Sequence, residues 1–181
     1  KIEKKWQVIF EDKTTSLELK ADHSALIMKQ IWDFSQTVDI DDVKEILDRQ
    51  ITCNMAIANE GIHNSYGANI GHVILNMDLD CVKTRAKAYA AAGSDARMNG
   101  CELPVVINSG SGNQGITCCV PVVVYAKELN STQEQLYRAL VLSNLTAIYI
   151  KTGIGTLSAF CGAVSAGAAA GAGIAYLHNG T

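Results

Sequence analysis

The sequence predicts a mainly α protein: a multi-helix bundle with a buried Ala/Gly-rich central helix, preceded by a short β remnant. Three observations lead to this fold class. From residue 22 onward, apolar residues recur at the spacing of three and four that marks one face of a helix. Capping residues and glycines divide these stretches into separate helices. Residues 153–177 carry no charge and are rich in alanine and glycine, which suits a helix approached closely by its neighbours.

The composition restricts the class of protein further. The 181 residues are 48% apolar, which is enough for the core of one domain. The net charge is −3 and the basic residues are scattered, which argues against a nucleic-acid partner. The start of the chain lacks the apolar region of a signal peptide, and the cysteines are too sparse and irregular for a disulfide framework. We therefore expect a cytoplasmic protein with reduced thiols.

The first twenty residues differ from the rest. Residues 6–10 and 16–20 are short, partly alternating runs, which predicts a β-hairpin or two strand remnants. Because two strands alone are marginally stable, we expect their partners outside this chain. We interpret residues 1–20 as a remnant of a neighbouring α+β part and residues 21–181 as a partial helical domain. The chain is thus expected to be a fragment of a longer protein.

Four helices are expected in the first half of the helical part. Acidic or serine residues cap the first and fourth, aspartates favour the start of the second, and a glycine ends it. In chain order they run from Asp22 or Ser24 to Phe34, over residues 43–61, over residues 65–75, and from Asp78 or Asp80 to Ala92. A polar connector is expected over residues 94–100.

Three more helices are expected in the second half. The first starts near Asn113 and kinks at Pro121, because proline lacks an N–H and clashes one turn back. A capping box at residues 131–134 opens the next, which runs to Gly153. The last covers residues 153–177. It is long enough to span a bilayer, but it has few large apolar residues and neither a basic flank nor an aromatic belt. We therefore predict that it is buried on all sides in the bundle and does not span a membrane.

A polar, glycine-rich loop over residues 108–115 lies between two apolar segments. Glycine lets a backbone turn tightly and approach a ligand closely. If a helix starts after the loop, its first N–H groups can bind a carboxylate or phosphate. The alternative is an ordinary tight turn whose side chains bond to their own backbone. The candidate binding residues of the loop are Ser109, Gly110, Ser111, Gly112, Asn113 and Gln114.

Two charged residues precede the loop by about a dozen positions. Asp95 and Arg97 could reach a ligand there, and the arginine could clamp a carboxylate through two parallel hydrogen bonds. The alternative is a local Asp–Arg pair at a helix end, which the spacing alone favours.

The cysteines and histidines have no metal-binding spacing by themselves. No C-x-x-C motif occurs, and adjacent Cys118 and Cys119 would face about 100° apart on a helix. We therefore interpret both as packing residues. Cys161 stands at the start of the small-residue helix, and composition alone would make it a core residue too.

Three stretches together are similar to a known family: residues 94–100, residues 108–116 with 121–124, and residues 157–161. They read S-D-A-R-M-N-G, N-S-G-S-G-N-Q-G-I with P-V-V-V, and L-S-A-F-C. The chain resembles the L-cysteine desulfidase family, whose members are related to the alpha chain of iron–sulfur L-serine dehydratase. The resemblance runs from about residue 46 to the C-terminus.

The resemblance implies a helical catalytic domain with an oxygen-labile [4Fe–4S] cluster held by three cysteines. Cys161 matches one of these cysteines. The motifs that carry the other two do not occur in this chain, so we expect the fragment alone to hold no stable cluster. The implied reaction converts L-cysteine into pyruvate, ammonia and hydrogen sulfide. The resemblance assigns the loop to the substrate carboxylate or amine, with Arg97 as a possible carboxylate partner, and leaves the general base unnamed.

Two alternatives remain open at this point. One keeps the class and changes the substrate to L-serine or another small β-substituted amino acid. The other is a binding domain that kept the fold and lost catalysis. The expected partner is in each case a small amino acid, and a homodimer is possible.

Overall fold

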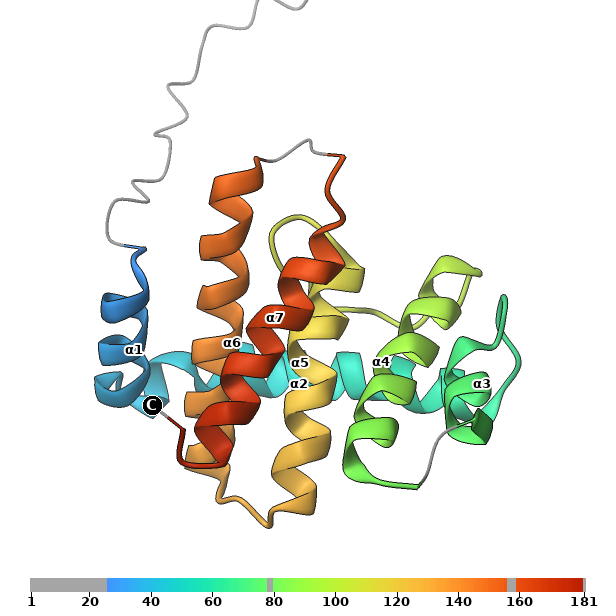
Figure 1. The fold of residues 1–181 in the computed structure, drawn as a ribbon, viewed down its shortest axis with the longest axis horizontal. Coiled ribbons are helices and arrows are strands. Elements are labelled where there is room, and N and C mark those ends of the chain that lie inside the picture. Colours follow the sequence, from blue (N-terminus) through green and yellow to red (C-terminus); the bar gives the residue numbers. More distant parts are fainter. Residues whose placement is uncertain (1–25, 78–79, 156–158, 181) are drawn as a thin grey trace, which may run out of the picture.

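The computed structural model describes residues 26–77, 80–155 and 159–180, and over these residues it is helical without a β-strand (Figure 1). The helices are α1 (Met28–Thr37), α2 (Ile40–His63), α3 (Ile70–Met77), α4 (Val82–Met98), α5 (Gly112–Glu128), α6 (Gln133–Ile154) and α7 (Gly162–Leu177). The mainly α prediction is confirmed. The predicted strands lie outside the described residues, so they stay a prediction.

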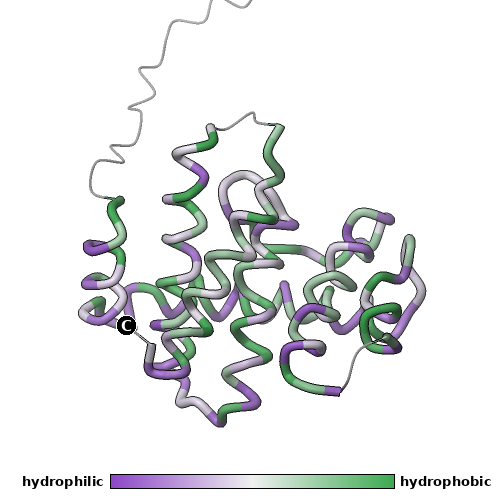
Figure 2. The backbone as a smooth tube through the Cα atoms, viewed as in Figure 1, coloured by the Kyte–Doolittle hydropathy of each residue, from purple (hydrophilic) through white to green (hydrophobic). Residues whose placement is uncertain are grey.

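Helices α5, α6 and α7 pack against one another and form the centre of the domain (Figure 1). The long α2 crosses them and contacts α4 beyond α5. The two shortest flanking helices lie at opposite ends, α1 against α6 and α3 against α4. Apolar and polar residues alternate along most helices, as expected for helices with one buried face (Figure 2).

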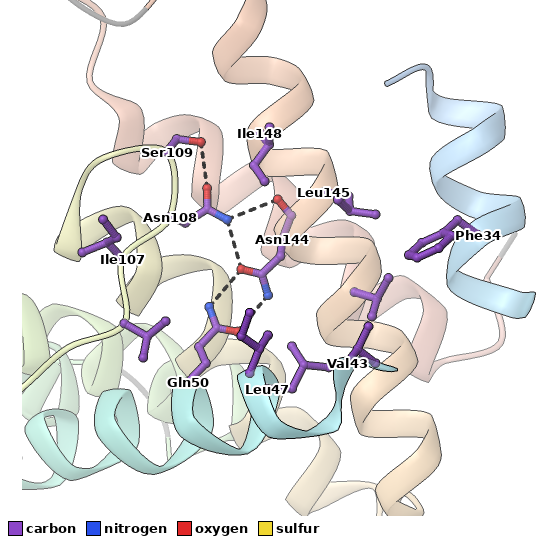
Figure 3. Close-up of a pocket in the computed structure, with 13 residues that line it drawn as sticks. Phe34, Val43, Leu47, Gln50, Ile107, Asn108, Ser109, Asn144, Leu145 and Ile148 are labelled. Atoms are coloured by element: carbon purple, nitrogen blue, oxygen red, sulfur yellow. Dashed lines mark hydrogen bonds between the residues drawn. The ribbon is translucent and has the colours of Figure 1, made fainter. Parts of the chain in front are cut away.

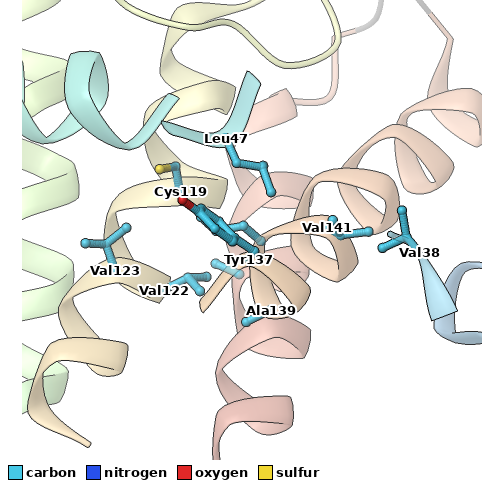
Figure 4. Packing of buried hydrophobic residues seen from close by; sticks show 10 residues of the cluster. Val38, Leu47, Cys119, Val122, Val123, Tyr137, Ala139 and Val141 are labelled. Atoms are coloured by element: carbon cyan, nitrogen blue, oxygen red, sulfur yellow. The ribbon is translucent and has the colours of Figure 1, made fainter. Parts of the chain in front are cut away.

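The main core lies where α2, α5 and α6 meet. Leu47, Cys119, Val122 and Leu140 are at most 3% exposed there, and Tyr137 reaches across from α6 (Figure 4). Complete burial of side chains of this size contributes roughly 1.5–3 kcal/mol each. Cys118 and Cys119 are both fully buried, as expected for packing residues.

Two predicted boundaries in α3 and α4 are wrong. The third helix begins at Ile70 rather than residue 65, because Gly67 and Asn69 have positive φ angles of 53° each and form a turn. The fourth helix continues through the expected connector to Met98. It does so because Ala96 is completely buried in the core, which fixes one more turn of helix.

The fifth and sixth helices were predicted more accurately. Helix α5 contains Pro121 in its interior and continues past it to Glu128. A capping box opens α6, but its members are Thr132 and Gln135, one residue later than the sequence suggested.

The predicted last helix is wrong in its start and in its burial. Helix α6 ends at Ile154, and Gly155 with φ 79° stops it, so α7 begins only at Gly162. One side of α7 is buried through residues such as Ala166 and Ala169, while Val164 is 75% exposed. Small apolar residues do not require burial on every side. None of the helices in the described part of the chain is long and apolar enough to cross a membrane.

Candidate functional site

The glycine-rich loop forms a tight two-residue turn immediately before α5. Asn108 and Ser111 exchange backbone hydrogen bonds of 3.1 and 3.0 Å. Between them, Ser109 and Gly110 have φ angles of 48° and 81°. Two successive positive φ values define a type I′ turn, which suits glycine and is strained for serine. The loop is therefore a tight turn and also leads into the start of a helix. The two interpretations of the sequence, a tight turn and a helix start that can bind an anion, do not exclude each other.

The start of α5 has no side-chain cap. Ser111 is its N-cap residue, and its hydroxyl does not accept a hydrogen bond from the first turn. The first N–H groups of a helix have no intrahelical partner and carry a partial positive charge. The loop thus presents backbone donors that suit an anionic group.

Arg97 lies directly against this helix start. Its Nη1 donates a hydrogen bond of 3.0 Å to Asn113 Oδ1. The guanidinium also packs on Gly112, where a Cβ would stand 2.7 Å from Arg97 Cζ, so residue 112 has no room for a side chain. The ion pairs of the described residues include none with Arg97. Arg97 thus places a positive charge beside the start of α5 without a carboxylate partner in the described part of the chain.

Asp95 turns away from the loop. Its Oδ2 accepts a hydrogen bond of 2.8 Å from the backbone N–H of Ile70, the first residue of α3. The described ion pairs also include none between Asp95 and Arg97, so the local pair that the spacing favoured is not formed. The structure brings Arg97 to the loop and engages Asp95 elsewhere.

A second helix start meets the first. Cys161 is the N-cap residue of α7, again without a side-chain cap, and it is exposed. The next residue, Gly162, lies against Gln114, since a Cβ at position 162 would be 2.7 Å from Gln114 Oε1. Helices α5 and α7 pack along each other, so their first turns stand together at one end of the bundle (Figure 1). The loop therefore reaches the immediate chain neighbour of Cys161.

Gln114 is the buried polar group between the two helix starts. The residue is only 5% exposed, and its Oε1 has no hydrogen-bond partner among the residues that the structure describes. An unsatisfied buried acceptor costs about 1–3 kcal/mol, so most buried acceptors bind a donor of the protein, an ordered water or a ligand. Gln114 thus supplies an acceptor beside two sets of backbone donors.

The described residues place one exposed thiol where the two helix starts meet. Cys161 is exposed there, whereas burial raises the pKa of the Cys118 thiol to about 12 and that of Cys119 also well above its ordinary value. Both buried thiols therefore stay protonated, and metals bind thiolates. Over residues 26–77, 80–155 and 159–180, no group of three His, Cys, Asp or Glu side chains could hold a metal ion. Any further ligands of a cluster would come from outside these residues.

An amide network holds the other side of the loop (Figure 3). Gln50 of α2 and Asn144 of α6 exchange two hydrogen bonds of 2.9 and 2.8 Å, and Asn108 Nδ2 donates to Asn144 Oδ1 at 3.0 Å. A pocket of about 370 Å³ opens beside them, with mostly apolar walls that include Phe34 and Ile148. Sequence reasoning missed Gln50 and Asn144. The available signal was an amide at a buried position of an otherwise apolar helix face.

These features define a class of protein: a helical domain whose candidate site joins a glycine-rich loop, an arginine and an exposed cysteine at two helix starts. Residues 5–181 match the model of the serine dehydratase alpha chain family. The chain belongs to this family.

Curated relatives extend beyond the chain. A UPF0597 protein of Desulfitobacterium hafniense is 56% identical over 99% of this chain, and a UPF0597 protein of Lachnoclostridium phytofermentans is 55% identical over 99%. A third, from Treponema denticola, is 48% identical over the same share. The chain spans only 42%, 43% and 44% of these relatives' lengths. No solved structure matches the chain.

Proposed function

We propose that this chain carries the substrate-binding part of an iron–sulfur-dependent lyase that eliminates hydrogen sulfide from L-cysteine. The family membership supports a lyase of the serine dehydratase alpha type. The whole protein's reaction would be L-cysteine plus water giving pyruvate, ammonia and hydrogen sulfide. L-Serine, with water as the leaving group, is the second candidate, because the family's description names serine dehydratase.

The observation that carries the proposal is the unpartnered, buried Oε1 of Gln114 between two uncapped helix starts. An α-amino acid carries a carboxylate for the backbone donors and an amino group for the Gln114 acceptor. Its carboxylate can accept hydrogen bonds from the N–H groups of α5 and from the Arg97 guanidinium. Its amino group can donate to Gln114 Oε1. The site therefore recognises an amino acid by its two common groups and leaves the β-substituent to point toward Cys161.

We further propose that Cys161 is one ligand of a [4Fe–4S] cluster in the full-length protein. Its thiol is exposed at the start of α7, next to the glycine that contacts Gln114. When bound, a cluster with an open iron would supply a Lewis acid for the leaving group. The chain's own residues hold the carboxylate and the amino group, which fixes the Cα–H and Cβ–S bonds for elimination. The remaining ligands are assigned to the part of the protein outside the described residues.

The test uses the full-length protein, reconstituted anaerobically with iron and sulfide. Pyruvate is measured with L-cysteine and with L-serine as substrate, and we expect L-cysteine to give the higher kcat/KM. A Cys161→Ala variant should lose pyruvate formation and the cluster's visible absorbance. Cys81→Ala, another exposed cysteine, is the matched control and should keep both.

Three outcomes decide between the candidates. A higher kcat/KM for L-serine would change the substrate assignment and keep the lyase. Binding of L-cysteine without pyruvate would favour a binding domain that lost catalysis. Pyruvate formation at an undiminished rate by Cys161→Ala would overturn the ligand assignment.

A further inference from the structure

The strained turn at Ser109 and Gly110 is fixed from outside the loop. Ser109 is a non-glycine residue with φ 48°, a conformation that persists only where the surroundings impose it. Ser109 Oγ donates a hydrogen bond of 2.9 Å to Asn108 Oδ1. Asn108 Nδ2 in turn donates to Asn144 of α6, so the turn is tied to that helix.

Asn144 is the centre of this contact (Figure 3). Its Oδ1 accepts hydrogen bonds from Gln50 Nε2 at 2.9 Å and from Asn108 Nδ2 at 3.0 Å. Its Nδ2 donates to Gln50 Oε1 at 2.8 Å and to the Leu140 carbonyl oxygen at 2.9 Å. Every donor and acceptor of the Asn144 amide is used, so its orientation is fixed.

The network is partly buried and joins elements that are distant in sequence. Gln50 is 3% exposed and Asn108 is 5% exposed. A hydrogen bond in such surroundings is stronger than in water, and a fully satisfied network selects one arrangement of its parts. Helices α2 and α6 therefore hold the position of the loop that precedes α5.

We propose that Asn144, held by Gln50, is a positioning residue that fixes Asn108 and thereby sets where the α5 start presents its N–H groups to the substrate. The inference rests on the proposed function for its catalytic consequence. Asn144 touches no substrate in this scheme. It acts through Asn108, the turn and Ser111, whose backbone N–H donates to the Asn108 carbonyl oxygen at 3.0 Å.

The test compares Asn144→Asp with Ser143→Ala in the full-length protein. A carboxylate cannot donate to Gln50 Oε1 or to the Leu140 carbonyl, so Asn144→Asp breaks the network with almost no change in volume. Ser143 is the matched control, because it is completely buried on the same helix and donates a hydrogen bond of 2.7 Å to the Cys118 carbonyl oxygen. Removing it weakens the contact of α5 with α6 but leaves the Asn108 network in place.

The first readout is hydrogen exchange of the backbone amides of residues 109–115. It should become at least tenfold faster in Asn144→Asp and stay within threefold of the wild type in Ser143→Ala. The second readout is steady-state kinetics with L-cysteine. KM should rise about tenfold in Asn144→Asp with kcat changed far less, because the lost element is the positioning of the binding groups.

A second variant protects the test against misfolding. Gln50→Met keeps the volume of the side chain and removes its two hydrogen bonds to Asn144, so it should change both readouts in the same direction by a smaller factor. Unchanged exchange of residues 109–115 in both variants, or an equal increase in Ser143→Ala, would overturn the inference. If the wild type forms no pyruvate, the proposed function fails, and the exchange measurement still decides the positioning role.

Discussion

Gly162 lies directly against Gln114, so that a Cβ on residue 162 would stand 2.7 Å from Gln114 Oε1. This contact joins the first turn of α7 to the glycine-rich loop, two segments that are about fifty positions apart in the chain. It places the exposed Cys161 near the buried amide of Gln114, whose Oε1 accepts no hydrogen bond from the described residues. The absence of a side chain at residue 162 is therefore what allows the two halves of the candidate site to meet.

Gly162→Ala should displace the Gln114 side chain and weaken amino-acid binding. We expect KM for L-cysteine to rise by about tenfold or more, because tenfold corresponds to about 1.4 kcal/mol, within the range for one lost hydrogen bond. Steady-state kinetics of the reconstituted full-length protein measures this change.

Gly171→Ala is the matched control for that variant. It lies on the same helix, and a Cβ there would meet nothing within 4 Å. Alanine in a helix interior is more favourable than glycine by about 1 kcal/mol, so the control should be slightly more stable with an unchanged KM. Equal KM values for the two variants would contradict the role of the Gly162–Gln114 contact.

Arg97→Lys should reduce the affinity for the substrate carboxylate. Lysine keeps the charge but loses the planar fork and its hydrogen bond to Asn113. Hydrogen bonds to charged groups contribute about 1.5–3 kcal/mol, so we expect KM to increase roughly 10- to 100-fold with a smaller change in kcat. Arg85→Lys is the control, because Arg85 pairs with Asp80 and Glu128 instead. An unchanged KM in Arg97→Lys would remove arginine from the binding site.

Asp95→Ala should affect stability rather than binding. The Asp95 carboxylate accepts a hydrogen bond from the first backbone N–H of α3, and losing such an acceptor at a helix start costs about 0.5–2 kcal/mol. The urea midpoint of unfolding should fall, while KM for L-cysteine should stay constant. Asp95→Asn keeps an acceptor, so its urea midpoint should lie between those of the wild type and Asp95→Ala. A higher KM with unchanged stability would instead return Asp95 to the substrate site.

The sequence was sufficient for the fold class because helical periodicity and capping residues are local signals. The turn before α5 could also be expected, since Gly110 permits a positive φ. The glycine-rich loop, which is one half of the candidate site, depends on such local signals. The partners of this half could not be predicted, because Gln50 and Asn144 meet Asn108 only after three distant segments have packed.

The burial of the last helix shows a second limit of sequence patterns. Alanine and glycine are tolerated inside and outside a protein, so residues 153–177 gave no signal for which side of α7 is exposed. The break before Gly162 was equally hidden, because every residue near it is uncharged. Yet that break is what exposes Cys161 and brings its neighbour to Gln114.

The stability of the domain should fall at alkaline pH because of the buried thiol of Cys118. Burial raises its pKa to about 12 in the folded protein, whereas a thiol in the unfolded chain titrates near about 8.5. The unfolded chain therefore releases this proton first as the pH rises. The stabilisation is fully present below the unfolded pKa and is lost as the pH approaches the folded pKa. One such group gives a slope of up to about 1.4 kcal/mol per pH unit, and Cys119 adds in the same direction.

Urea unfolding between about pH 8.5 and 9.5, below the ordinary range of tyrosine, measures this slope. Cys118→Ala should lower the free energy of unfolding at pH 7. It should also make this free energy fall less steeply with pH, by up to about 1.4 kcal/mol per pH unit. A wild-type slope in Cys118→Ala would mean that the thiol ionises equally easily in both states. The burial of Cys118 would then not be a cause of the loss of stability at alkaline pH.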